Sequence, residues 1–166
     1  MTTIATRLQQ VHARLDAACR AAQRDPASVT LLAVSKTCPA EAVAEAAAAG
    51  QTRFGENYVQ EGLEKIEALA ELRGRLEWHL IGPLQSNKTR AVAEAFDWVQ
   101  SVDRLKIAQR LAEQRPAWLP PLNLCLQVNV GGEASKSGVA PAELPALAAA
   151  VAALPPDRVR LRGLMH

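Results

Sequence analysis

The chain has 166 residues, 49% of them hydrophobic, and a formal net charge of +2. This length and apolar content suit one domain with a buried core. The small net charge disfavours nucleic acid and anionic membranes as partners, because both attract strongly basic proteins.

The cysteines and histidines show no pattern of a disulfide framework or a metal site. Cys19, Cys38 and Cys125 form no C-x-x-C pair and are odd in number, which indicates a reducing compartment. No apolar run approaches the ~20 residues that a membrane span requires, and the N-terminus lacks the features of a signal peptide. We therefore expect a cytoplasmic protein without a metal ion.

Residues 3–24 are predicted to form an amphipathic helix that ends at Asp25-Pro26. Short runs of strand formers then alternate with longer helical patterns. The predicted strands are Thr30–Ser35, Thr52–Gly55, Glu77–Ile81, Trp98–Val102, Leu122–Val130 and Val159–Met165, and the helical patterns between them are 40–49, 57–72, 87–95, 104–114 and 142–153. This alternation indicates βαβ units and a parallel sheet.

Two α/β architectures fit the alternation: a TIM-type (β/α)8 barrel and a doubly wound open sheet. The regular repeat favours the barrel, of which about six βα units are visible in the chain. No G-x-G-x-x-G follows the first predicted strand, which disfavours dinucleotide binding. In both architectures ligands bind at the carboxyl ends of the strands.

Lys36 follows the first predicted strand and shares its side-chain parity with Leu32 and Val34. If that parity faces the barrel interior, Lys36 points into the mouth of the site. Burial would lower the pKa of an amine at this position, and the neutral amine could then form a Schiff base. The alternative is a solvated lysine that closes a strand.

The next two predicted strands supply two more candidates: Asn57 follows the second strand, and His79 lies within the third. Asn57, with Gln60 three residues later, has the form of a helix N-cap that also faces the site. His79 lies inside an apolar run, which by itself favours a hydrogen-bonded core histidine over a site residue. A loop at 131–138, rich in Gly, Ser and Lys, could hold an anion or be an ordinary mobile loop.

Residues 82–89 nearly match the phosphate-binding pattern G-x-x-x-x-G-K-[ST]. The second glycine is replaced by Asn87, and that glycine is the residue that lets the backbone wrap the phosphates. A nucleotide-binding function at this segment is therefore a weak alternative.

Five segments together resemble the pyridoxal phosphate homeostasis proteins, the YggS/PROSC family. They are VSKT at 34–37, FGENYVQE at 54–61, EWHLIGPLQSNK at 77–88, SKSG at 135–138 and RLRGLM at 160–165. The resemblance covers the chain from the first helix to Met165. It implies a single barrel domain similar to the N-terminal domain of alanine racemase. It also implies that the protein binds pyridoxal 5′-phosphate without an established turnover.

The resemblance also implies the residues of the cofactor site. Lys36 would carry the cofactor as a Schiff base, Asn57 would lie beside it and His79 below its ring. Ser137 and Met165 would contribute further cofactor contacts. The expected partners are the cofactor and, through it, the apoenzymes that depend on it.

Members of the family continue beyond the GLM segment, so the domain over 1–166 is expected to be incomplete at its C-terminus. Compared with a chain extended by two βα units, we expect weaker cofactor binding, lower stability and self-association; the extended form is expected to be a monomer. The alternative function is a racemase or decarboxylase. A racemase needs a second acid/base group, commonly a tyrosine from a second domain, and the only tyrosine here is Tyr58.

Overall fold

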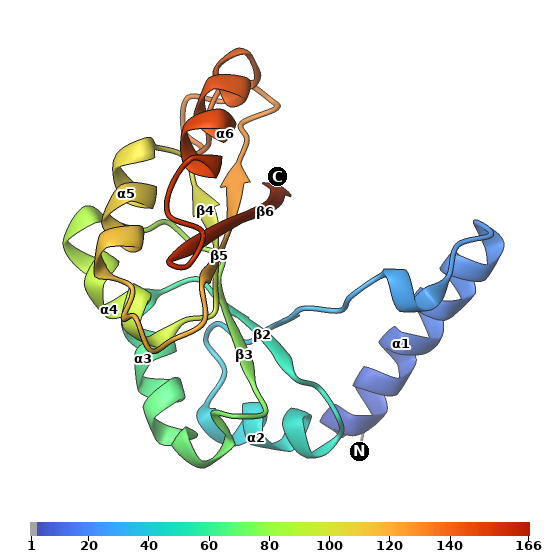
Figure 1. Cartoon of the computed structure of the whole chain (residues 1–166). Coiled ribbons are helices and arrows are strands. Elements are labelled where there is room, and N and C mark those ends of the chain that lie inside the picture. The colour runs from blue at the N-terminus through green and yellow to red at the C-terminus, as the bar shows by residue number, and fades with distance from the viewer. Residues whose placement is uncertain (1–2) are drawn as a thin grey trace.

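A computed structural model describes residues 3–166 (Figure 1) as helices and parallel strands that alternate along the chain. The strands are β1 (Ala33–Val34), β2 (Arg53–Glu56), β3 (Glu77–Leu80), β4 (Trp98–Val102), β5 (Leu122–Gln127) and β6 (Val159–Met165). The α-helices are α1 (Ile4–Ala21), α2 (Ala40–Ala48), α3 (Val59–Ala68), α4 (Thr89–Ala95), α5 (Leu105–Gln114) and α6 (Leu144–Ala152).

The strand order decides between the two predicted architectures. The six strands form one sheet in the order β1-β2-β3-β4-β5-β6, and every neighbouring pair is parallel. A doubly wound sheet reverses its order at a switch point, whereas a barrel adds each strand beside the previous one. The barrel-type prediction is therefore confirmed for these six units.

The helices that follow the strands cover one face of the sheet and build the core there, as Figure 1 shows for α3 to α6. The largest fully buried side chains of this layer include Phe54, Trp78, Leu80, Phe96, Ile107, Leu111, Leu122, Leu124 and Leu126. Because side chains alternate along a strand, the strand residues next to the buried ones point to the opposite face of the sheet. We call that opposite side, which carries Glu77, His79, Trp98, Gln100 and Arg162, the inner face.

Helix α1 precedes the sheet and packs on α2. The side chain of Thr3 caps it by accepting a hydrogen bond from the Thr6 N–H, and the Ile4 N–H donates to Glu45 at 3.2 Å. The helix ends at Ala21, three residues before the predicted end, and Asp25 caps a short 3-10 turn over Pro26–Ser28.

Strand β1 is shorter than predicted. Only Ala33 and Val34 pair with β2, opposite Phe54 and Gly55. Since β2 begins at Arg53, which lies opposite Leu32 in this register, residues 30 and 31 have no β2 residue beside them.

None of the helices within 3–166 is both long and apolar enough to cross a membrane. The same residues contain no cluster of three or more potential metal-ligating side chains.

Candidate functional site

The carboxyl ends of β1 and β2 place Lys36 and Asn57 side by side. Val34 pairs with Gly55, and the Ser35 N–H donates to the Gly55 carbonyl at 2.9 Å. The next pair along this register is Lys36 and Asn57. Val34, which shares the parity of Lys36, is 50% exposed, so both side chains point to the inner face rather than into the helical layer.

Lys36 is exposed in the structure. The expectation that its amine is buried is therefore wrong. Neither its amine nor the Asn57 amide takes part in the side-chain hydrogen bonds that join their neighbours within residues 3–166. Both groups thus remain available to a ligand on the inner face.

The predicted N-cap role of Asn57 is also wrong. Helix α3 begins after Tyr58, whose side chain makes no capping bond, and Gln60 instead donates to Glu64. Asn57 is held by a backbone contact. A Cβ on Gly82 would lie 2.0 Å from the Asn57 carbonyl oxygen, so only glycine lets the end of β3 approach Asn57 this closely.

His79 lies on the inner face one pleat below Lys36 and Asn57, because it pairs with Gly55. The Gln100 amide donates to Nδ1 at 2.8 Å, and Nε2 therefore carries the proton, which it donates to Glu77 at 2.7 Å. The ring stacks on Trp98 with centroids 5.0 Å apart. Burial lowers the pKa of His79 below its usual value, against the opposing effect of Glu77, so the imidazole is neutral at physiological pH.

Arg162 completes this stack from β6. Its guanidinium lies 5.0 Å from the centre of the Trp98 ring and donates to Asn123 at 3.0 Å. A cation over an aromatic face is attracted by the ring quadrupole. These contacts fix the ring planes beneath Lys36 and Asn57 before any ligand binds.

Ser137 and Met165 lie at the same edge of the sheet but beside β5 and β6. Both adjoin Gln127. Met165 pairs with Gln127 in the ladder, and the Gln127 side-chain amide donates to the Ser137 carbonyl at 3.4 Å. A cavity of about 620 Å³ opens here, with Ser137 and His166 in its lining. The structure thus brings Lys36 and Asn57 together as one group, and Ser137 and Met165 as another.

A charged network under Lys36 was not predicted. Lys65 from α3 is buried, with a side chain 6% exposed, and contacts Glu56, whose side chain is 0% exposed, at 2.8 Å. Lys65 also contacts Glu61 at 2.7 Å and the Ser35 carbonyl at 2.6 Å. The Ser35 hydroxyl donates to the same Glu56 oxygen at 2.6 Å.

The pKa shifts of Lys65 and Glu61 both favour the charged forms of these two side chains. The hydrogen bond from Lys65 lowers the pKa of Glu61, helped by the Thr37 N–H and opposed by burial. Burial acts to lower the pKa of Lys65, but Glu56 and Glu61 outweigh it and the pKa lies above its usual value. The only sequence signal was the spacing of Glu61 and Lys65, which is typical of an exposed helix pair.

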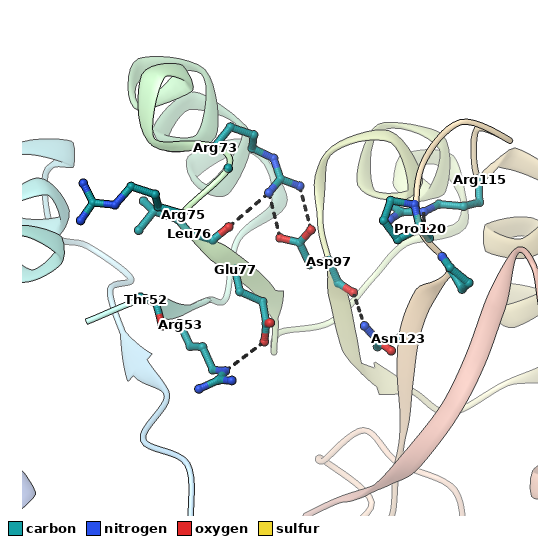
Figure 2. A pocket seen from close by; sticks show the side chains of 12 residues that line it. Thr52, Arg53, Arg73, Arg75, Leu76, Glu77, Asp97, Arg115, Pro120 and Asn123 are labelled. Atoms are coloured by element: carbon teal, nitrogen blue, oxygen red, sulfur yellow. Dashed lines mark hydrogen bonds and ion pairs between the residues drawn. The ribbon is translucent and has the colours of Figure 1, made fainter. Parts of the chain in front are cut away.

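The opposite ends of the strands form a second charged pocket of about 450 Å³ (Figure 2). Arg73 binds both oxygens of Asp97, at 2.9 and 3.1 Å, and Arg53 contacts Glu77 at 3.3 Å. In Figure 2, dashed lines join Arg73 to Asp97 and Arg53 to Glu77. Because ligands of barrel proteins bind at the carboxyl ends of the strands, we assign this pocket a structural role.

The segment 82–89 does not form a nucleotide site. Residues Ser86–Lys88 form a 3-10 turn, and α4 begins only at Thr89. The Thr89 hydroxyl, which would have to reach a magnesium ion, is fully buried and donates to the Ser86 carbonyl at 3.0 Å. Arg110 donates to both oxygens, so these groups are used inside the protein.

Comparisons with known proteins agree with the fold. The family model of the alanine racemase N-terminal domain matches residues 7–166. A pyridoxal phosphate homeostasis protein of Pseudomonas aeruginosa is 67% identical over 165 residues, which cover 99% of this chain and 70% of that protein. The namesake of Escherichia coli K12 is 60% identical over 166 residues, with the same coverage.

The chain belongs to the pyridoxal phosphate homeostasis protein family. Among solved structures, PipY of Synechococcus elongatus with PLP bound superposes with a TM-score of 0.74 at 42% identity, over 93% of this chain and 70% of that one. Family membership confirms the resemblance seen in the sequence motifs. It leaves the individual roles of Lys36, Asn57, His79, Ser137 and Met165 as predictions.

Proposed function

We propose that this chain binds pyridoxal 5′-phosphate at the carboxyl ends of β1 and β2, covalently through Lys36, and holds it without turning over a substrate. The observation that carries the proposal is the Lys36 amine. It is exposed on the inner face, next to Asn57, in a family whose relatives are named for pyridoxal phosphate homeostasis. PipY, whose structure was solved with PLP bound, has the same fold.

The side chains at this edge fit such a cofactor. Bound pyridoxal phosphate supplies an aldehyde that a lysine amine can attack and a flat, polar ring. Lys36 offers the amine and Asn57 offers an amide as donor or acceptor. His79 is neutral and locked by Glu77 and Gln100, so it presents an uncharged, fixed surface below these two residues.

Ser137 and Met165 belong to the same proposal as further contacts beside β5 and β6. The Ser137 hydroxyl lies on an exposed loop that lines the 620 Å³ cavity. A hydroxyl and neighbouring backbone N–H groups can bind a phosphate, while Met165 offers an apolar, adaptable side chain.

The proposal that the protein holds the cofactor without turnover, as a carrier, also includes its location, its oligomeric state and its partners. We propose that it works in the cytoplasm and passes the cofactor to apoenzymes, and that the form extended by two βα units does so as a monomer. A lysine that captures and releases an aldehyde reversibly can serve as a store. Sizing chromatography of the extended form would test the monomer, and the 166-residue chain should elute as larger species beside it.

A racemase-like activity is the second candidate, because the matching family model is that of the alanine racemase N-terminal domain. It is less favoured because a racemase needs a second acid/base group opposite the lysine. The only tyrosine, Tyr58, is 59% exposed at the start of α3. Steady deuteration and inversion of alanine or serine by loaded protein in deuterated water would overturn the carrier reading in favour of this one.

The covalent bond to Lys36 can be tested directly. Pyridoxal phosphate is added, the adduct is reduced with borohydride, and the labelled peptide is found by mass. We expect the label on Lys36, and its loss in both Lys36→Ala and Lys36→Arg, because a guanidinium stays protonated. Lys88→Ala, which removes an exposed lysine elsewhere, is the matched control and should keep the label. A label mainly on Lys88 or Lys136 would overturn the assignment.

A further inference from the structure

Lys65 uses all three of its ammonium protons inside the protein. They go to the Ser35 carbonyl at 2.6 Å, to Glu61 at 2.7 Å and to Glu56 at 2.8 Å. An ammonium group has three donors and no acceptor, so nothing of Lys65 remains for a ligand. Its contacts nevertheless end directly beside Lys36.

Glu61 carries the network to the other side of Lys36. The oxygen that binds Lys65 also accepts the Thr37 N–H at 2.5 Å. Thr37 has a φ of +62°, a left-handed conformation that β-branched residues rarely adopt. Such a conformation persists where surrounding contacts enforce it, and Glu61 supplies one of them.

Both peptide groups that join Lys36 to the chain are therefore held by one buried cation and its partner. The carbonyl of the preceding peptide binds Lys65, and the N–H of the following peptide binds Glu61. Ser35 is fixed a second time, through its hydroxyl on Glu56. The side chain of Lys36 is exposed while its backbone is held from both sides.

We infer that Lys65 and Glu61 are positioning residues for Lys36, and that the rate at which Lys36 captures pyridoxal phosphate depends on the Glu61–Thr37 contact. The inference rests on the proposed function. A small displacement of a reacting atom can slow a reaction on the order of a hundredfold. Loss of one of the two backbone anchors, with the other intact, is expected to slow capture about tenfold on the same scale.

The test uses three variants on α3. Glu61→Ala removes the acceptor of the Thr37 N–H. Glu61→Gln keeps an oxygen acceptor at the same place and serves as the conservative rescue. Glu64→Ala is the matched control, since Glu64 is exposed on the same helix and binds only Gln60. For each, the rate of pyridoxal phosphate attachment to Lys36 and the thermal melt are measured.

We expect Glu61→Ala to slow attachment about tenfold, Glu61→Gln to stay within about threefold of the unmodified chain and Glu64→Ala to be unchanged. We also expect Glu61→Ala to melt within a few degrees of Glu64→Ala, so that the slower rate does not follow from unfolding. Equal rates for Glu61→Ala and Glu64→Ala, or a loss of rate that follows the melting temperature across all variants, would overturn the inference.

A second probe separates this inference from the proposed function. Acylation of lysines by acetic anhydride needs no cofactor, and its rate at Lys36 can be compared with that at exposed Lys106 by mass. If the unmodified chain captures no pyridoxal phosphate but Glu61→Ala still changes the acylation ratio, the proposed function fails and the positioning role stands. If neither reaction at Lys36 responds to Glu61→Ala, the positioning role fails.

Discussion

Both edges of the sheet carry buried or half-buried charged side chains. The two sets differ in the parts of the chain that they bind. At the amino edge, Asp97 accepts from Arg73 and from the Trp78 N–H at 2.8 Å, and Arg115 donates to three backbone carbonyls. These groups hold strands and loops to one another. At the carboxyl edge, Lys65 holds the backbone around Lys36 and leaves the Lys36 amine exposed.

The difference predicts that substitutions at the two edges have different consequences for stability and for the proposed cofactor capture. Charges at the amino edge join β3, β4 and the loop before β5. Charges at the carboxyl edge fix one backbone segment whose side chain is left unused. Substitutions at the amino edge should therefore change the free energy of unfolding alone, whereas those at the carboxyl edge should also change cofactor capture.

The largest effect is expected from Lys65→Met. It leaves the fully buried Glu56 without its cation, and the Glu56 Oε2 has no hydrogen-bond partner within residues 3–166. Breaking a buried ion pair from one side costs about 3–5 kcal/mol. We expect urea denaturation to show a loss of this size, together with slower attachment of pyridoxal phosphate to Lys36.

The double variant Lys65→Met/Glu56→Gln serves as the control for this loss. It removes the unpaired charge along with the lysine, so it should recover much of the stability but none of the capture rate. If Lys65→Met were as stable as the unmodified chain, the buried pair would not support the carboxyl edge.

Arg115→Met should give the next largest effect, at the amino edge. Arg115 is buried and donates to the carbonyls of Ala93, Phe96 and Pro120 at 2.7 to 2.8 Å. Methionine has no donor, and buried acceptors without partners cost about 1–3 kcal/mol each before water or relaxation compensates. We expect a net loss of about 2–3 kcal/mol by urea denaturation.

The exposed Arg75 in the same pocket provides the matched control. Arg75→Met should change stability by less than about 0.5 kcal/mol, as surface substitutions usually do. Below their melting ranges both variants should attach pyridoxal phosphate at the unmodified rate. Slower capture by Arg115→Met in the folded state would contradict the separation of the two edges.

The smallest expected effect is the pH dependence that His79 brings to the inner face. Burial lowers the pKa of His79 in the folded chain, so the unfolded chain binds a proton more readily as the pH falls through about 6.5. Stability should then decrease toward acid. Between pH 7.5 and 5.5 the loss from this group is at most about 1.4 kcal/mol.

His79→Gln cannot bind this proton and should show a flatter stability curve over the same pH range. Urea denaturation of both chains at pH 7.5 and 5.5 measures the difference. A steeper acid loss in His79→Gln than in the unmodified chain would mean that His79 binds its proton more readily in the folded state.

Much of the fold could be predicted from the sequence because its signals are local. The bounds of β4 and β6 match the predicted strands, and β3 ends one residue earlier than expected. The choice of a barrel over a doubly wound sheet rested on the regular repeat alone and is confirmed by the strand order. Strand β1 was overestimated because its length depends on where β2 begins, which is not a property of residues 30–35.

The candidate site divides in the same way. The parity of Lys36, the place of Asn57 after β2 and the place of His79 within β3 follow from short segments. The burial of Lys65 does not, because it requires Glu56 from β2 and the Ser35 carbonyl from the end of β1 to meet on one helix. Within α3 alone, a lysine four residues after a glutamate looks like a solvent-exposed pair.

The stack of Trp98 between strands also gives the inner face an optical property. The indole lies 5.0 Å from the His79 ring and 5.0 Å from the Arg162 guanidinium. Indole emission is quenched by a nearby imidazolium and changes with the polarity around the ring. Once Trp118, which is 84% exposed, is replaced by phenylalanine, the remaining fluorescence comes from Trp98 and the buried Trp78. Trp98 is thus an intrinsic fluorophore one pleat below Lys36, and we expect its emission to change with the titration of His79 and with the binding of a ligand at the proposed site.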